Sequence, residues 1–334
     1  MARLARIKFS DPEEGYYHIT SRTVLKSFLL DKAEKEYFLK LLKVLSQVYF
    51  VRVVTFAIMS NHFHLIIQMI PSRKISQEDL KRRFELYYNA NILKKYHRVF
   101  EHHDQVQFRH RLEDVSCFIQ DLKQRFSRWY NRQTQGHGHV WAERFKSVLL
   151  QGDRALLACM VYVELNSVRA GMVKQPEEYR YCGLSHYLTG GRAAKWLDYG
   201  SLQELMKETP LETAQPPGAL LRRYLAIIYH EGMIERPGKA HISENDGELA
   251  LSSDFAGSEV LSFRRRIRYF SDGVFLGSRA FCEAKFQEFR SYFQTRKERS
   301  GKLIHYPHKH KKGRVSAPPD HLLHLHSIRS FSFH

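Results

Sequence analysis

Residues 60–67 read Ser-Asn-His-Phe-His-Leu-Ile-Ile. They lie within residues 50–69, a segment rich in β-branched and aromatic side chains that only the Ser-Asn pair interrupts, so the segment predicts a β-hairpin. Because successive side chains of a strand alternate between its two faces, His62 and His64 project to the same side of the second strand. The sequence therefore predicts two imidazoles that face one point.

Two imidazoles on a rigid strand are good ligands for a divalent metal ion, and one further ligand from elsewhere would complete an open, catalytic site. A closed structural zinc site would need four ligands, usually with cysteine, and the neighbouring sequence supplies none. Three other His-X-His triplets occur in glycine-rich or basic sequence, at residues 137–139, 308–310 and 324–326. The apolar hairpin sets His62 and His64 apart from these. The alternative is that both are polar residues on the wet face of a sheet.

A second segment, residues 152–171, predicts an amphipathic helix that begins after a Gly-Asp pair and ends at Gly171. Residues four apart share a helix face, so Tyr162 and Asn166 point in the same direction. A phenol with a pKa of about 10 is a poor nucleophile at neutral pH, and a metal ion that polarises a phosphate target lowers that barrier. Tyr162 is thus a candidate nucleophile and the Asn166 amide oxygen a candidate metal ligand. The alternative is that Tyr162 is an ordinary packed tyrosine.

The residues named so far resemble a known family. Residues 60–65 look like the His-hydrophobic-His (HUH) motif of single-tyrosine transposases, in particular the REP-associated tyrosine transposases, which are related to the IS200-like group. The resemblance spans residues 1–190. Four further blocks agree with the family in the same order, at residues 17–22, 126–146, 162–171 and 179–187.

The resemblance implies a chemistry as well as a fold. It makes Tyr162 the nucleophile and assigns three metal ligands, which are His62, His64 and Asn166. Oxygen and imidazole ligands accept either Mg²⁺ or Mn²⁺ as the cofactor. In the family, the tyrosine attacks a phosphodiester of single-stranded or hairpin DNA, which leaves a 5′-phosphotyrosine link and a free 3′-hydroxyl that can reseal or be transferred. Ser167 stands where the family usually has proline, so the local turn is expected to differ.

The composition agrees with a nucleic-acid partner. The 334 residues carry a formal net charge of +18, and Lys and Arg side chains that neutralise phosphates supply most non-specific affinity for nucleic acids. No run of about 18 apolar residues and no signal peptide is found, so we expect a cytoplasmic protein without a membrane partner, associated with the nucleoid when bound to DNA. The 4 cysteines lack metal or disulfide spacing and are expected to be reduced thiols.

The order of the predicted elements indicates an α+β fold, with an antiparallel sheet and helices on one face. This order agrees with the ferredoxin-like nuclease core that the resemblance implies, followed by a smaller, mainly helical C-terminal region. We expect four parts: the tyrosine transposase domain at residues 1–190 with a helical insert at about 77–111, a linker region at 191–218, a mainly helical domain at 219–300 that could bind DNA, and a disordered, basic, His-rich tail at 301–334.

The 219–300 region contains one candidate DNA-binding motif. Residues 276–279 could be the turn of a helix-turn-helix in which Ser278 caps the recognition helix. A basic cluster precedes it at residues 264–268. The alternative is two ordinary helices and a solvated basic face.

Basic and aromatic side chains near the tyrosine helix are candidate DNA contacts. Arg144 and Lys146 lie two apart on a predicted strand and so face the same way. Six basic residues are expected to contact DNA: Lys123, Arg125, Arg128, Arg144, Lys146 and Arg169. Aromatic rings stack on unpaired bases in single-strand binding, and the candidates, which could instead belong to the core, are Trp129, Tyr130 and Trp141.

Three functions stay open from the sequence. The first is a metal-dependent enzyme that nicks and transfers DNA strands, acting as a monomer or a homodimer. The second is a domesticated hairpin-DNA-binding protein or regulator with little or no cleavage, and the third is an RNA-binding or structural protein. The presence of all four candidate site residues favours the first, because a protein that only binds needs none of them together.

Overall fold

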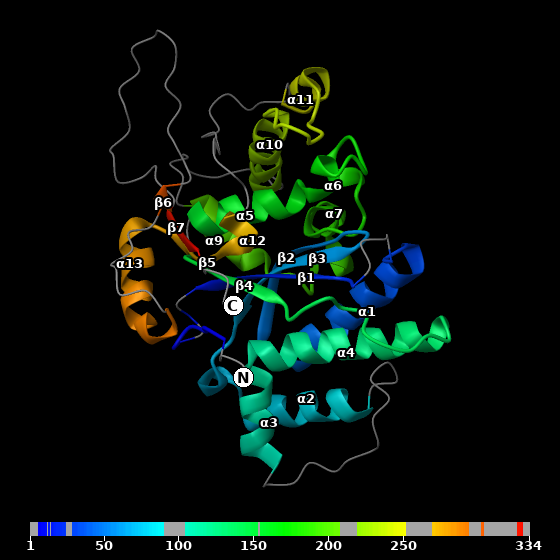
Figure 1. The fold of residues 1–334 in the computed structure, drawn as a ribbon, viewed down its shortest axis with the longest axis vertical. Coiled ribbons are helices and arrows are strands. Elements are labelled where there is room, and N and C mark those ends of the chain that lie inside the picture. Colours follow the sequence, from blue (N-terminus) through cyan, green and yellow to red (C-terminus); the bar gives the residue numbers. More distant parts are fainter. Residues whose placement is uncertain are drawn as a thin grey trace.

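The computed structural model describes residues 6–11, 13, 15–24, 29–89, 104–152, 154–207, 219–251, 269–293, 302–303 and 326–329. Within these residues, seven strands form one sheet in the order β2-β3-β1-β4-β5-β7-β6 (Figure 1). The strands are β1 Tyr16–Arg22, β2 Val51–Ile58, β3 His62–Met69, β4 Lys146–Leu150, β5 Gly273–Gly277, β6 Lys302–Leu303 and β7 His326–Arg329.

The helices follow the chain around this sheet. Those before the last strand of the core are α1 Lys32–Val48, α2 Gln77–Asn89, α3 Asp104–Glu113 and α4 Val115–Gln133. Those of the middle part are α5 Arg154–Glu164, α6 Asn166–Arg169, α7 Gly183–Thr189, α8 Gly191–Ala194 and α9 Tyr199–Lys207. The remaining ones are α10 Ala219–Met233, α11 Glu244–Leu251, α12 Tyr269–Asp272 and α13 Arg279–Glu288.

The first four strands and two of the helices form a ferredoxin-like core. Along the chain they read β1-α1-β2-β3-α4-β4, and in the sheet they read β4-β1-β3-β2 with every neighbouring pair antiparallel. The hairpin of β2 and β3 turns at Ser60 and Asn61, where the apolar run breaks, as predicted. The expected α+β class is therefore confirmed, and the predicted insert at about 77–111 contains α2 and α3.

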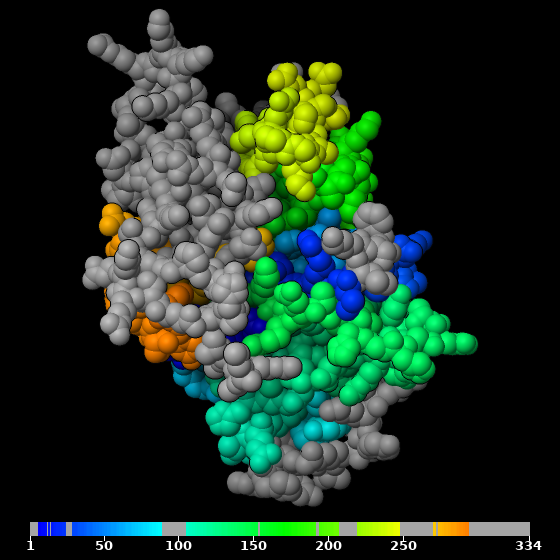
Figure 2. Space-filling model, viewed as in Figure 1, coloured from blue at the N-terminus to red at the C-terminus, as the bar shows by residue number. Residues whose placement is uncertain are grey.

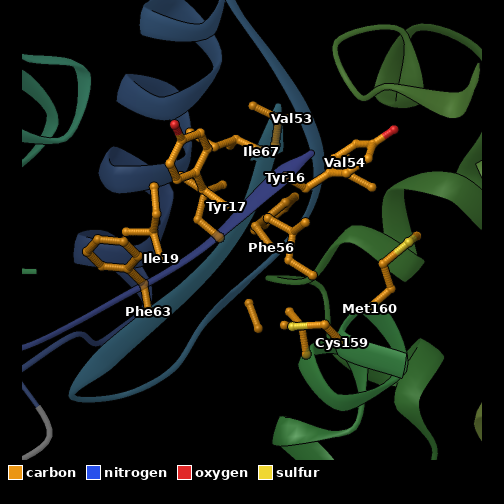
Figure 3. Packing of buried hydrophobic residues seen from close by; sticks show 14 of the residues in the cluster. Tyr16, Tyr17, Ile19, Val53, Val54, Phe56, Phe63, Ile67, Cys159 and Met160 are labelled. Atoms are coloured by element: carbon orange, nitrogen blue, oxygen red, sulfur yellow. The ribbon is translucent and has the colours of Figure 1, made fainter. Parts of the chain in front are cut away.

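The two faces of the sheet differ because side chains alternate along each strand. Phe63 contacts Phe38 of α1, with ring centroids 4.9 Å apart, and α4 packs beside α1 on this face. His64 points to the opposite face, which α5 covers. Figure 3 shows Ile19 and Phe63 on one side of the strands and Cys159 of α5 on the other. Helices thus cover both faces, whereas the sequence predicted them on one face only.

The C-terminal region contributes to this same sheet. β5 pairs with β4 in parallel, and β7 pairs with β5 in antiparallel orientation. The turn predicted at residues 276–279 is wrong, because its first two residues belong to β5. Ser278 does cap the following helix, since its hydroxyl accepts the backbone N–H of Phe281 at 3.2 Å. In place of a helix-turn-helix, the structure has a strand that extends the sheet of the core.

The other predictions for the C-terminal half agree with the structure only in part. α10 and α11 pack on each other and project from the body, in yellow in Figure 2. The linker region contains α8 and α9, and the tail contains β6 and β7, so these pieces are ordered. The rest of the linker, most of the tail and the basic cluster at residues 264–268 lie outside the described residues. The division of the chain into domains stays a prediction.

Among the described residues, no helix combines the length and the apolar character that crossing a bilayer requires.

Candidate active site

A pocket of about 700 Å³ lies where the end of β1, the start of β3 and the junction of α5 and α6 meet. The loop before β4, the loop after α10 and helix α12 complete its wall. Four residues singled out in the sequence line this pocket together: His62, His64, Tyr162 and Asn166. Strand alternation and helix spacing therefore bring two distant segments to one place.

The two histidines stand side by side on β3. Their ring centroids are 5.0 Å apart and their planes are inclined by 78°. The Nδ1 of His62 lies 2.7 Å from the Asn61 amide oxygen, and the Nδ1 of His64 lies 3.0 Å from Nε2 of His18. Within the described part of the chain, both Nε2 atoms are left without a protein hydrogen bond, and both rings line the pocket.

Burial keeps both rings neutral near neutral pH. Burial, together with the nearby charges of Arg22 and Lys239, lowers the pKa of His62 to about 4. Burial, followed by the neighbouring His62 and His18, lowers the pKa of His64 well below its ordinary value. A neutral imidazole offers a lone pair, so the pair is suited to bind a divalent ion through the two Nε2 atoms.

Tyr162 lies against these histidines. Its ring meets the ring of His64 edge to face with centroids 5.5 Å apart, and that of His18 at 6.0 Å. The ring of Phe270 from α12 stacks on its other side at 4.8 Å and an interplanar angle of 12°. Three rings from three elements therefore hold the phenol beside the two imidazoles.

Asn166 reaches the pocket from a broken helix. The predicted continuous helix over residues 152–171 is interrupted at Leu165, between α5 and α6, and it ends as expected at Gly171, which has a left-handed φ of 68°. The Asn166 Nδ2 donates to the backbone carbonyl oxygens of Tyr162 at 2.8 Å and Val163 at 3.3 Å. A carbonyl only accepts, so the amide nitrogen is engaged and the amide oxygen is the atom left for a ligand.

Arg144 and Lys146 line the pocket, as the sequence led us to expect, although Arg144 precedes the strand that begins at Lys146. Lys123 instead donates to the carbonyl oxygen of Glu143 at 2.8 Å and so holds the loop that carries Arg144. Arg128 does not line the pocket. These placements favour direct DNA contact for two of the predicted basic residues and a supporting role for Lys123.

Two further residues that the sequence offered as DNA contacts lie in the protein interior. Arg125 is only 8% exposed and lies over the ring of Tyr87, 5.1 Å from its centroid. Trp141, expected as a base-stacking candidate, is 8% exposed and contacts Phe63 and Phe126 in the core. Buried side chains cannot reach DNA, so we correct Arg125 to a structural role, and Trp141 follows the core alternative that the sequence left open.

Arg169 faces the loop between α10 and α11. Its Nη1 donates to the carbonyl oxygens of Ile234 at 2.8 Å and Ala240 at 3.2 Å, and its Nη2 donates to that of Glu231 at 2.7 Å. The residue is 9% exposed. The guanidinium thus clamps residues 231–240, and a direct contact with DNA is not the role that this geometry supports.

Several pocket residues were not singled out from the sequence. His18 lies on β1 beside His64, and strand alternation could have placed it there only if the pairing of β1 with β3 were known. Arg236 and Lys239 come from the loop that Arg169 clamps, and Phe270 comes from α12. Nothing local in the sequence ties these three to the histidines, since only the tertiary fold brings them together.

One comparison with known proteins agrees with the motif at residues 60–65. The family model described as "Transposase IS200 like" matches residues 13–108, which confirms the resemblance found in the sequence. That range contains the two histidines of β3 and ends before Tyr162. A solved structure described as "Structure of the REP associates tyrosine transposase bound to a REP hairpin" is similar over 65% of this chain and 93% of that chain, with 12% identity and a TM-score of 0.38. No curated protein matches the chain.

Proposed function

We propose that this chain, which is similar to IS200-like transposases over residues 13–108, is a metal-dependent tyrosine transposase that cleaves and rejoins single-stranded DNA at hairpin repeats. The observation that carries the proposal is the convergence of Tyr162 and two neutral histidines in one pocket with basic walls. A protein that only binds DNA would have no use for this arrangement.

The donor set fits Mg²⁺ or Mn²⁺. The ligands would be Nε2 of His62, Nε2 of His64 and the amide oxygen of Asn166, since the other polar atoms of these three side chains are engaged with the protein. When bound, the ion would polarise the phosphate that is attacked.

The reaction is a transesterification at phosphorus. The Tyr162 oxygen forms a bond to the phosphorus, the bond from phosphorus to the 3′-oxygen breaks, the phenol gives up its proton and the leaving 3′-oxygen gains one. The product is a 5′-phosphotyrosine and a free 3′-hydroxyl, and attack by a 3′-hydroxyl reverses the step. Packing between the stacked ring of Phe270 and the edge-to-face ring of His64 restricts the Tyr162 ring to one orientation, which lowers the entropic cost of reaching the phosphate.

Basic side chains would hold the DNA backbone on both sides of the tyrosine. Arg144 and Lys146 line one wall, Lys239 lines another, and Arg22 lies opposite His62 in the β1–β3 pairing. Arg236 also lines the pocket, but its guanidinium is paired with the buried Glu231 carboxylate. Lys and Arg near phosphates release counterions, so binding should weaken steeply with salt. The pocket walls are therefore positively charged, and a DNA backbone bound along them would pass Tyr162.

The test is a cleavage assay with a matched control. The full chain, Tyr162→Phe and Tyr37→Phe are incubated with labelled hairpin DNA from the flanks of the protein's own gene, with Mn²⁺ or with EDTA, and separated by denaturing electrophoresis. Tyr37 lies on α1 at the opposite face of the sheet, so its variant should cleave normally. We expect a cut strand and a covalent protein–DNA band that require both metal and Tyr162. Tight hairpin binding with neither product would favour the domesticated binder.

A further inference from the structure

His18 links the metal-binding histidine to the C-terminal region. Its side chain is fully buried, with 0% exposure, and its ring stacks on that of His64 with centroids 5.2 Å apart and an angle of 11°. Its Nδ1 lies 2.7 Å from the carbonyl oxygen of Phe270, and its Nε2 lies 3.0 Å from Nδ1 of His64. A chain of two hydrogen bonds therefore runs from α12 to His64.

The donor and the acceptor of each hydrogen bond can be assigned by starting from the Phe270 carbonyl. A carbonyl oxygen can only accept, so Nδ1 of His18 carries the hydrogen. Burial disfavours a charged imidazole, and a neutral ring with a hydrogen on Nδ1 has a lone pair on Nε2. That lone pair accepts the hydrogen on Nδ1 of His64, which leaves the lone pair of His64 on Nε2. His64 lines the pocket, and its Nε2 has no protein hydrogen bond in the described residues.

We propose that His18, oriented by the Phe270 carbonyl, is a positioning residue that fixes His64 in the tautomer able to bind a metal ion, and that helix α12 is thereby part of the active site. The inference rests on the proposed function for the identity of the ligand. His62 has its own acceptor, the Asn61 amide oxygen, so the two ligands are oriented by different segments of the chain. Metal-bound histidines generally need such a partner, and its loss typically weakens metal binding 10- to 100-fold.

Phe270 has two separate contacts in this arrangement. Its backbone oxygen accepts from His18, whereas its ring stacks on Tyr162. One residue of α12 therefore orients a metal ligand through the backbone and the nucleophile through the side chain. This pairing explains why a segment outside the residues that match the family model lies against the pocket.

Two variants of His18 separate orientation from packing. His18→Leu fills the space and has no acceptor. His18→Gln keeps an amide N–H for the Phe270 carbonyl and an amide oxygen for His64. Ile19→Val, on the other face of β1, is a control for small losses of stability. We expect the Mn²⁺ dissociation constant, from electron paramagnetic resonance of the free ion, to rise about 10- to 100-fold in His18→Leu and to stay within about threefold in the other two.

A second readout does not involve the metal. Nitrogen-15 NMR of the metal-free full chain, with histidine labelled and His64 assigned from His64→Ala, reports which ring nitrogen carries the hydrogen. We expect Nδ1 of His64 to carry it in the wild type and in His18→Gln, and a shift toward the Nε2 form in His18→Leu. The wild-type spectrum alone tests the inference if His18→Leu does not fold.

Three results would overturn the inference. One is an Nε2-protonated His64 in the wild type, another is equal loss of Mn²⁺ affinity in His18→Leu and His18→Gln, and the third is unchanged affinity in a folded His18→Leu. Failure of the proposed function looks different. A wild-type protein that has the expected tautomer and orients His64 through His18, but cuts no DNA, removes the transposase proposal and leaves the positioning role intact.

Discussion

Replacing Arg169 with alanine tests how the C-terminal loop is attached to the pocket. Three hydrogen bonds from the guanidinium to the carbonyl oxygens of Glu231, Ile234 and Ala240 disappear. At about 1 kcal/mol for each bond, the loop loses about 3 kcal/mol of local stability, which corresponds to a roughly 100-fold larger population of open loop. Because Lys239 belongs to this loop and lines the pocket, we expect DNA binding to weaken even though Arg169 itself is buried.

Hydrogen exchange followed by mass spectrometry measures this opening directly. Peptides that cover residues 231–242 should exchange faster in Arg169→Ala, whereas peptides from β2 should not change. Arg128→Ala removes the same charge from an exposed site and serves as the control. A different result would refute this reasoning: the loop exchanges at the wild-type rate, while DNA affinity falls and depends less on salt. Arg169 would then contact a phosphate directly, and it would not act by holding residues 231–240.

Three other predictions use standard measurements. Burial raises the pKa of the Glu164 carboxyl to about 7, so the fold keeps a proton that the unfolded chain loses, and stability should fall by up to about 3 kcal/mol between about pH 4.5 and 7. Urea unfolding at several pH values should show this slope in the wild type and not in Glu164→Gln. Replacing Arg144 and Lys146 with alanine should reduce the slope of log affinity for single-stranded DNA against log salt by about 1.4, measured by fluorescence anisotropy; an unchanged slope would place the DNA elsewhere. Mn²⁺ at one hundred times its dissociation constant should stabilise the protein by about 2.7 kcal/mol, and thermal unfolding should show no such gain when His62 and His64 are both alanine.

Local periodicity accounts for the parts of the site that the sequence predicted. Alternation along β3 puts His62 and His64 on one face, and helical spacing aims Tyr162 and Asn166 at the same pocket. The α+β core follows from the same patterns, because the order of strands and helices restricts the topologies that can form. These are short-range properties, and neighbouring residues express them without help from the rest of the chain.

The missed features depend on partners that are distant in sequence. β5 is a five-residue apolar segment that begins and ends with glycine, so its sequence resembles a turn. It is a strand because it pairs with β4, which is distant in the sequence. In the sequence, Arg169 and Lys123 look like exposed cations on a helix. Only the fold shows that their side chains donate hydrogen bonds to backbone carbonyl oxygens. His18 lies within the block at residues 17–22 that resembles the family, but its role depends on Phe270, which follows it by 252 residues.

The position of Phe270 has a consequence for how the protein is made. A ribosome adds about 5–20 residues per second, so Tyr162 and both histidines of β3 are synthesised several seconds before α12. Pairing β5 with β4 must also close a long loop, and contacts of that kind form slowly. The nascent chain therefore contains Tyr162, His62 and His64 before the ring and carbonyl of Phe270 that contact Tyr162 and His18 exist, and a finished pocket appears only after most of the polypeptide has been translated.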